Sequence, residues 1–131
     1  MSVSELKYHH ITEKIIGAAM KVHRYFGPGF PEYIYQRALM IELDLLGMEC
    51  RQEVETERWY HSQLIGKRRL DVIVEELVLV ECKARKDWYY TALNQVFNYL
   101  KVFKVEVGLL INFGASSLQF KRFILTQDKG G

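Results

Sequence analysis

The segment from Arg69 to Ala84 (RLDVIVEELVLVECKA) constrains this chain most, because two short apolar, β-branched runs flank a charged break. Runs of this kind bounded by turn signals are typical of buried strands. Glu75 and Glu76 form the break, so the segment predicts a β-hairpin centred on Glu76. In an antiparallel pair with this centre, residues equally far before and after Glu76 face each other, and Asp71 lies opposite Glu81.

The predicted hairpin brings two acids and a lysine together. Residues directly opposite in an antiparallel pair have Cβ atoms about 4.5–5.5 Å apart. Lys83 shares the face of Glu81 because alternate strand residues point the same way, whereas Cys82 points into the core. The register is an assumption at this point, since a slip of one residue would move Asp71 to the other face.

Two neighbouring carboxylates repel each other, and a divalent cation relieves that repulsion. Magnesium prefers hard oxygen ligands, which are usually one or two carboxylates together with water and substrate phosphate. Asp71, Glu81 and Lys83 therefore predict a Mg²⁺ or Mn²⁺ site for phosphodiester hydrolysis, in which Lys83 positions the attacking water or stabilises negative charge. The alternative interpretation of Glu81 and Lys83 is a structural salt bridge at a strand end.

Hydrophobic spacing and chain breakers divide the rest of the sequence into elements. We expect helices over 4–26, 31–46 and 88–103, with Ser4 as the first N-cap. We expect strands over 49–59, 64–74, 77–82, 105–113 and 118–125, the last of them at an edge. This order predicts an α/β (α+β) fold in which a mixed β-sheet is flanked by α-helices.

Composition limits what the chain can be. Its 131 residues predict one domain over 1–131, with a polar tail over 126–131 that frays. The net charge of +2 is too small for a domain-wide nucleic-acid binder, so such contacts must come from local clusters. Cys50 and Cys82 lack a CxxC spacing, and no signal peptide or membrane span is evident, which predicts a cytoplasmic location.

Several motifs resemble one known superfamily. Asp71 followed by Glu81-Cys82-Lys83 resembles the D…(D/E)XK signature of restriction-enzyme-like nucleases. Gly29-Phe-Pro-Glu-Tyr-Ile-Tyr35 matches the GxxExxY pattern of a family of small bacterial and archaeal proteins assigned to that superfamily. Gln95-Val-Phe-Asn-Tyr99 resembles the QxxxY motif of RecB-like nucleases, and the run over 107–114 is also similar to the GxxExxY family. The resemblance covers roughly residues 11–125.

This resemblance implies a PD-(D/E)XK, restriction-endonuclease-like core and a metal-dependent nuclease acting on DNA or, less favoured, RNA. It implies that Asp71 and Glu81 ligate the metal together with the backbone carbonyl of Cys82. Lys83 would be the catalytic lysine, and Glu32 would be the helical acid that completes the site. The alternative function is a catalytically inactive nucleic-acid-binding or protein-interaction module on the same fold. The intact acid and lysine set favours the enzyme.

Further residues are candidates for supporting roles. Tyr35 lies beside Glu32 on its helix, and Gln95 and Tyr99 share a helix face that could orient the lysine, a water or a phosphate. Four basic residues flank the proposed site in sequence and are expected to contact phosphates: Lys67, Arg69, Arg85 and Lys86. Their alternative reading is a solvated charged surface. For Trp59-Tyr60, core packing or a contact in a homodimer is favoured over stacking on unpaired bases.

Overall fold

The computed structural model describes residues 7–52, 55–69, 72–86 and 105–124. The elements along this part of the chain are α2 (His9–Phe26), α3 (Glu32–Leu45), β1 (Cys50–Gln52), β2 (Glu55–Tyr60), β3 (Gln63–Arg69), β4 (Val72–Val74), β5 (Val78–Lys83), β6 (Val107–Asn112) and β7 (Gln119–Ile124). The helix expected over 88–103 and the frayed tail expected over 126–131 lie outside the described residues.

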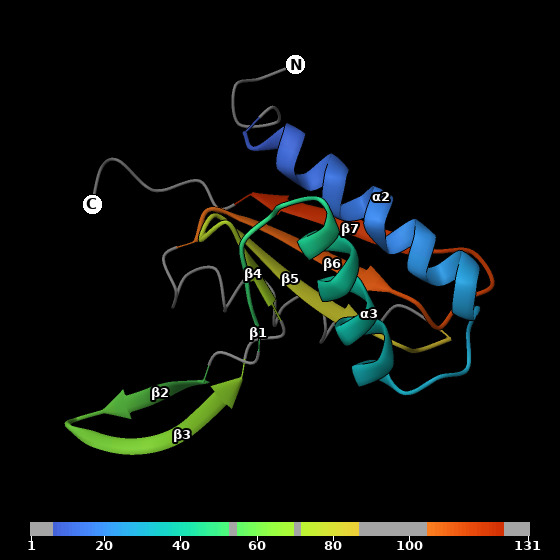
Figure 1. The fold of residues 1–131 in the computed structure, drawn as a ribbon. Helices are drawn as coiled ribbons and strands as arrows, with labels where there is room; N and C mark the ends of the chain where they lie inside the picture. The colour runs from blue at the N-terminus through green and yellow to red at the C-terminus, as the bar shows by residue number, and fades with distance from the viewer. Residues whose placement is uncertain (1–6, 53–54, 70–71, 87–104, 125–131) are drawn as a thin grey trace.

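Five of the strands form one mixed sheet in the order β1-β4-β5-β6-β7. The β5–β6 pair is parallel, and the other three pairs are antiparallel. Helices α2 and α3 cover one face of this sheet (Figure 1). The predicted mixed sheet with flanking helices is therefore confirmed, and β7 lies at a sheet edge as expected.

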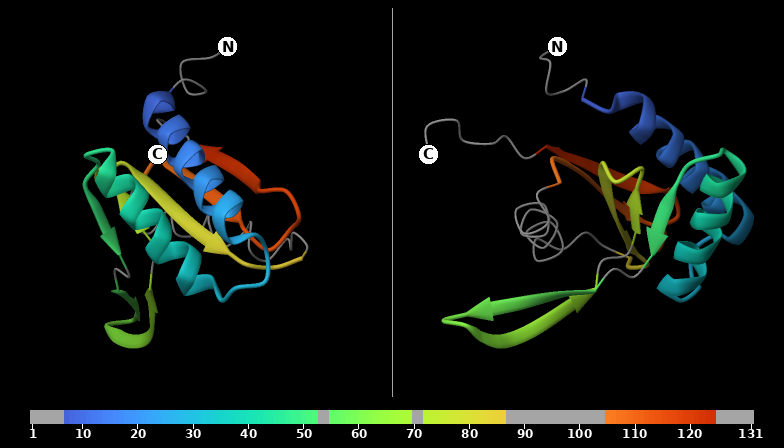
Figure 2. Two further views of the ribbon diagram at one scale, coloured as in Figure 1. Left: turned by 45° about the vertical axis from the view of Figure 1, so that its right-hand side comes forward. Right: turned by 60° about the vertical axis from the view of Figure 1, so that its left-hand side comes forward.

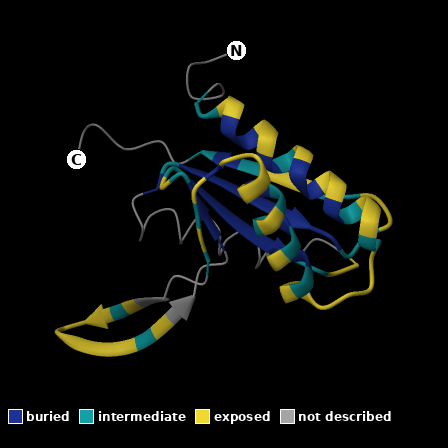
Figure 3. Cartoon of the chain, in the orientation of Figure 1, coloured by how far each residue is buried: buried dark blue, intermediate teal, exposed yellow. Residues whose placement is uncertain are grey.

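The core lies between the helices and this face of the sheet. Its helical side includes Ile11, Ile15 and Val22 of α2, whose spacing of three and four residues matches the apolar stripe in the sequence. Its sheet side includes Val80 and Cys82 of β5, so the prediction that Cys82 points into the core is confirmed. Strands β5 and β6 are buried along almost their whole length (Figure 3), as expected for central strands covered on both faces.

Helix α2 begins later than the sequence suggests. Lys7 and Tyr8 form a turn, and Tyr8 is the N-cap with a left-handed φ of 53°. An α-helix cannot continue through a residue in that conformation. The predicted start at Ser4 is therefore wrong for the first turn, and Ser4 itself lies outside the described residues. Helix α3 begins at Glu32 with Pro31 as N-cap, close to the predicted start.

The two long strands predicted over 49–59 and 64–74 are each divided between two sheets. β1 and β4 pair in the main sheet, whereas β2 and β3 form a separate two-stranded sheet that projects from the body (Figure 2). We call β2–β3 the arm. Charged and polar residues make up most of the arm and its apolar side chains gather near the turn, so it has no continuous apolar face to pack on the main core. His61 and Ser62, both with positive φ, form its turn.

The loop between the two helices is held by Tyr35. This fully buried residue donates a hydrogen bond from its hydroxyl to the carbonyl oxygen of Gly27 (2.5 Å) and accepts one from the N–H of Phe30 (3.1 Å). Gly29 has a φ of 107°, a conformation that only glycine adopts easily. The glycine and the tyrosine of the GxxExxY pattern thus shape one tight connection, which sets where α3 begins.

None of the described helices is long and apolar enough to span a membrane.

We expect Tyr35→Phe to lower the free energy of unfolding by about 1–3 kcal/mol, because two backbone groups of the loop lose their partner. Tyr33→Phe is the matched control, since Tyr33 is exposed on the same helix. Urea unfolding followed by circular dichroism measures both. Equal stabilities of the two variants would show that the Tyr35 hydroxyl does not hold the loop.

Candidate active site

The hairpin that carries the predicted site has the expected register. Val72 faces Val80 and Val74 faces Val78 across β4 and β5, which centres the hairpin on Glu76. Glu75 and Glu76 both have positive φ, and the N–H of Leu77 donates to the carbonyl of Val74 (3.0 Å), as in a tight turn. Asp71 lies outside the described residues, so its place opposite Glu81 stays a prediction.

Glu81 and Lys83 form a close, buried pair at the carboxyl end of β5. The Lys83 Nζ lies 3.3 Å from Oε1 of Glu81, and the two side chains are only 15% and 6% exposed. They belong to the strand positions between those that face α2 and α3, so they lie on the opposite face of the sheet. The structure thus brings the predicted glutamate and lysine together on one face.

The backbone of β5 adds an oxygen to the same place. The N–H of Phe113 donates to the carbonyl oxygen of Lys83 (2.8 Å), which therefore points toward β6. Successive carbonyls of a strand alternate in direction, so the carbonyl of Cys82 points to the β4 side. That is the side on which the sequence predicts Asp71. A carboxylate and a backbone carbonyl are the hard oxygen donors that Mg²⁺ and Mn²⁺ favour, so this donor set fits the predicted metal.

Helix α3 begins with Glu32 near the same end of the sheet. Tyr35 stacks on Phe113 with ring centroids 4.7 Å apart, and Phe113 is bonded to Lys83. Glu32 lies one turn before Tyr35, exposed in the first turn of α3. Within the described residues, no three His, Cys, Asp or Glu side chains are close enough together to hold a metal ion. A three-carboxylate site therefore needs Asp71 as a member.

A clamp formed by Asn112 and Gly114 fixes the chain just after Lys83. The side-chain oxygen of Asn112 accepts hydrogen bonds from the N–H groups of Arg85 (2.9 Å) and Gly114 (3.1 Å). Its amide nitrogen donates to the carbonyl of Arg85 (2.7 Å) and to the side chain of Gln119 (2.8 Å). Asn112 is buried, so these bonds satisfy its polar atoms where water does not reach.

Gly114 completes this clamp by its lack of a side chain. A Cβ at this position would overlap the backbone of Ala84 and Arg85. The sequence interpretation assigned no role to Asn112. The sequence did contain a signal for this role. A polar residue ends an otherwise apolar strand and is followed closely by glycine, and a buried amide in that place needs hydrogen-bond partners.

Comparison with known proteins agrees with this geometry. The sequence profile of the PD-(D/E)XK nuclease superfamily matches residues 9–123. The chain belongs to this superfamily. The crystal structure of SSO0001 is similar in fold, with a TM-score of 0.55 and 22% sequence identity over 76% of this chain. The matched region is 52% of the SSO0001 chain, so the present chain spans about half of that protein's length. No curated protein matches significantly.

The superfamily match confirms the nuclease resemblance and, with the similar crystal structure, the restriction-endonuclease-like fold. It covers the helix and strands that carry Glu32, Glu81 and Lys83. Gln95 and Tyr99, the predicted QxxxY pair, lie outside the described residues, so their supporting role stays a prediction.

The basic residues around the site differ in position. Arg85 and Lys86 directly follow β5 and are exposed. Lys67 is exposed on the arm, opposite Glu57 in the register. Arg69 is the last residue of β3, and its side chain lies outside the description. Of these four basic residues, only Arg85 and Lys86 are thus shown beside Lys83, whereas Lys67 lies on the projecting arm.

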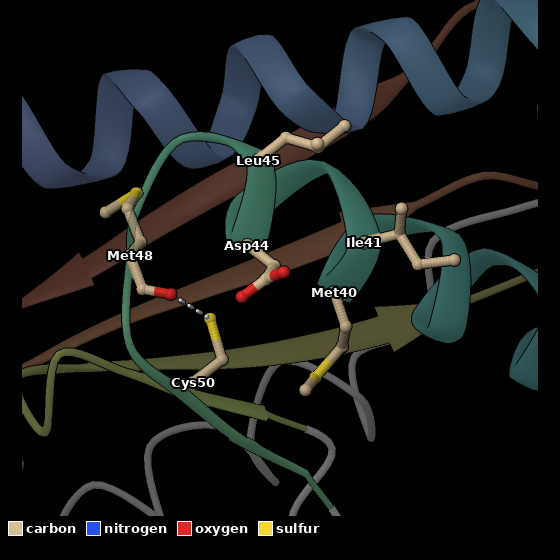
Figure 4. A pocket seen from close by; sticks show the side chains of 6 residues that line it. All are labelled: Met40, Ile41, Asp44, Leu45, Met48 and Cys50. Atoms are coloured by element: carbon tan, nitrogen blue, oxygen red, sulfur yellow. Dashed lines mark hydrogen bonds between the residues drawn. The ribbon is translucent and has the colours of Figure 1, made fainter.

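A pocket at the far end of α3 is separate from these candidate residues (Figure 4). It is lined by Met40, Ile41, Asp44, Leu45, Met48 and Cys50. The Cys50 thiol donates to the carbonyl of Met48 (3.6 Å). Burial raises the pKa of the Cys50 thiol to about 11, and neighbouring carboxylates, first Glu75 and then Asp44, act in the same direction. The thiol is therefore protonated near neutral pH and is no nucleophile there.

We expect Gly114→Ala to destabilise the protein by about 2–4 kcal/mol, because the new methyl group would overlap backbone atoms of Ala84 and Arg85, which cannot move aside without disturbing the fold. Gly17→Ala is the matched control. It adds the same methyl group to open space on α2 and should stabilise by about 0.5–1 kcal/mol. Thermal unfolding of both variants checks this pair. A neutral Gly114→Ala would show that the close approach to Arg85 is not required.

We also expect the native protein to resist thiol modification at pH 8. The raised pKa of Cys50 lowers its thiolate fraction roughly 100-fold relative to a thiol of pKa 9.0, and Cys82 is fully buried. Modification of Cys50 should accelerate as the pH approaches 11. Mass spectrometry after iodoacetamide treatment measures both sites, and the denatured protein serves as the reactive control. Native labelling of Cys50 at the denatured rate would contradict its assigned environment.

Proposed function

We propose that this chain is a metal-dependent nuclease that hydrolyses phosphodiester bonds in DNA or, as a less favoured substrate, RNA. The observation that carries this proposal is the buried Glu81–Lys83 pair at the carboxyl end of β5. A buried ion pair is costly to desolvate and adds little net stability, so a chemical role accounts for it better than a structural one. The confirmed hairpin register supports Asp71 as the facing acid.

The residues would divide the chemistry among themselves as follows. Asp71, Glu81 and the Cys82 carbonyl would hold Mg²⁺ or Mn²⁺, with Glu32 reaching in from α3. The ion, when bound, supplies a Lewis acid for the phosphoryl oxygen. Lys83, held beside Glu81, orients the attacking water and stabilises negative charge on the phosphoryl group. Arg85 and Lys86 lie directly beyond Lys83 and would contact neighbouring phosphates.

We also infer that the chain is a GxxExxY protein. Gly29 and Tyr35 shape the loop before α3, and the Tyr35–Phe113 stack ties the start of that helix to the end of β5. The pattern would then exist to aim Glu32 at the metal. Similarly, the shared core of α2, α3 and the main sheet supports one domain over 1–131. Within the described residues Cys50 and Cys82 form no disulfide, which is compatible with the predicted cytoplasmic location.

We expect the wild-type chain to cut DNA only when Mg²⁺ or Mn²⁺ is present, and Lys83→Ala to reduce the rate at least about 100-fold. Single-stranded and duplex DNA and an RNA of the same sequence are incubated with and without metal. Lys21→Ala, an exposed lysine on α2, is the matched control and should cut at the wild-type rate. Cutting that survives in Lys83→Ala would identify a contaminant.

Because Lys83→Ala leaves Glu81 without its cation partner, a second variant guards against a simple folding defect. Lys83→Arg keeps the positive charge but changes its shape, so it should fold while still losing activity. Glu81→Gln should abolish Mg²⁺ or Mn²⁺ binding in calorimetry. Tight nucleic-acid binding without cutting in any metal would instead favour the inactive binding module.

A further inference from the structure

The arm has no packing partner among the described elements. Within the part of the chain that the structure describes, its two strands pair only with each other, and they extend away from the main sheet and from α2 and α3 (Figures 1 and 2). An isolated two-stranded hairpin is only marginally stable in water. A projecting hairpin of this kind is therefore best explained by something that it binds.

The outer end of the arm is apolar and aromatic. Trp59 and Tyr60 are 59% and 65% exposed, and Leu64 and Ile65 beside them are exposed too. Core packing, one of the two expected uses of Trp59 and Tyr60, is therefore wrong, because these residues lie on a ribbon too thin to bury them. The other expected use, a contact in a homodimer, stays a prediction. Exposed apolar side chains gathered at one place mark a binding surface.

The net positive charge of the chain also comes from the arm. Its residues 55–69 include four Lys or Arg and two Glu, which gives a net charge of +2, equal to that of all 131 residues. The remainder of the chain is balanced, with 14 basic and 14 acidic residues after subtracting the arm from the totals of 18 and 16. The partner that fits this charge is an anion.

The root of the arm lies at the candidate active site. β3 ends at Arg69, and β4 begins at Val72, which faces Val80 next to Glu81. The arm therefore leaves the main sheet at the same end as Glu81 and Lys83. A chain of phosphates seated at that site could continue along the arm.

We propose that the arm binds a single-stranded stretch of nucleic acid adjoining the cleavage site, with Trp59 and Tyr60 stacking on unpaired bases. A single strand of nucleic acid offers phosphates to the basic residues and flat base faces to the aromatic tip. Unpaired bases are required because the faces of bases in a duplex are already stacked. This proposal rests on the proposed function for the position of the substrate, but not for the binding itself.

Fluorescence anisotropy with a labelled single-stranded DNA of about twenty nucleotides tests the arm. EDTA or Ca²⁺ replaces Mg²⁺, so that binding is measured without cleavage. The double variant Trp59→Ala/Tyr60→Ala should bind at least about tenfold more weakly than wild type. Tyr25→Ala is the matched control because Tyr25 is 83% exposed on α2, and it should bind as wild type does.

A second pair of variants separates stacking from general apolar contact. Trp59→Phe keeps an aromatic face and should retain most of the affinity, whereas Trp59→Leu keeps the apolar character without that face and should lose it. A duplex of the same sequence should bind more weakly and be less affected by both changes. Equal binding by the Phe and Leu variants would overturn the stacking.

Three results would overturn the proposal as a whole. The first is wild-type protein that binds no single strand in either buffer. The second is an equal loss in Tyr25→Ala and in the double variant. The third is a wild-type dimer that the double variant converts to monomer with unchanged DNA binding, since the arm would then bind a second copy of the chain. Failure of metal-dependent cutting while these binding results hold would reject only the proposed nuclease activity.

Discussion

The site depends on how strand β5 is held on both sides. On one side β4 pairs with its first half in antiparallel register, from Val72 opposite Val80 to Val74 opposite Val78. On the other side β6 runs parallel to it as far as Lys83 and Asn112. β5 is paired with β6 over its whole length and with β4 at Val78–Val80, and it is buried along almost its whole length, so it cannot slip or twist freely. The side chains of Glu81 and Lys83 can therefore be held together where little of either is exposed to water.

Elements far apart in the chain converge on the carboxyl end of this strand. Tyr35 ties the helix loop together with its hydroxyl and stacks with its ring on Phe113, and Phe113 is bonded to Lys83. Asn112 holds the next residues of the same segment. One small region thus links the helical layer, the parallel strand pair and the chain after the lysine, and this linkage preorganises the site.

The sequence predicted those features that depend on neighbouring residues. The hairpin register followed from two short apolar runs placed symmetrically about Glu76, and the alternation of strand side chains set Glu81 and Lys83 on one face. The arm was not predicted, because two continuous strand-like segments over 49–59 and 64–74 do not tell with which strand each half pairs. The Asn112 clamp was missed for a similar reason, since its partner Arg85 is 27 residues away in sequence.

Because β5 pairs in parallel with β6, the strand that supports the candidate site lies further along the sequence than the signature residues themselves. Every residue proposed for chemistry, from Glu32 to Tyr99, precedes residue 107, while the strand that secures the lysine end follows it. A fragment ending before Val107 would contain all the signature letters and still have one edge of β5 open to water. Recognition by signature alone would accept such a fragment as a nuclease, although its ion pair would sit on a strand free to exchange partners.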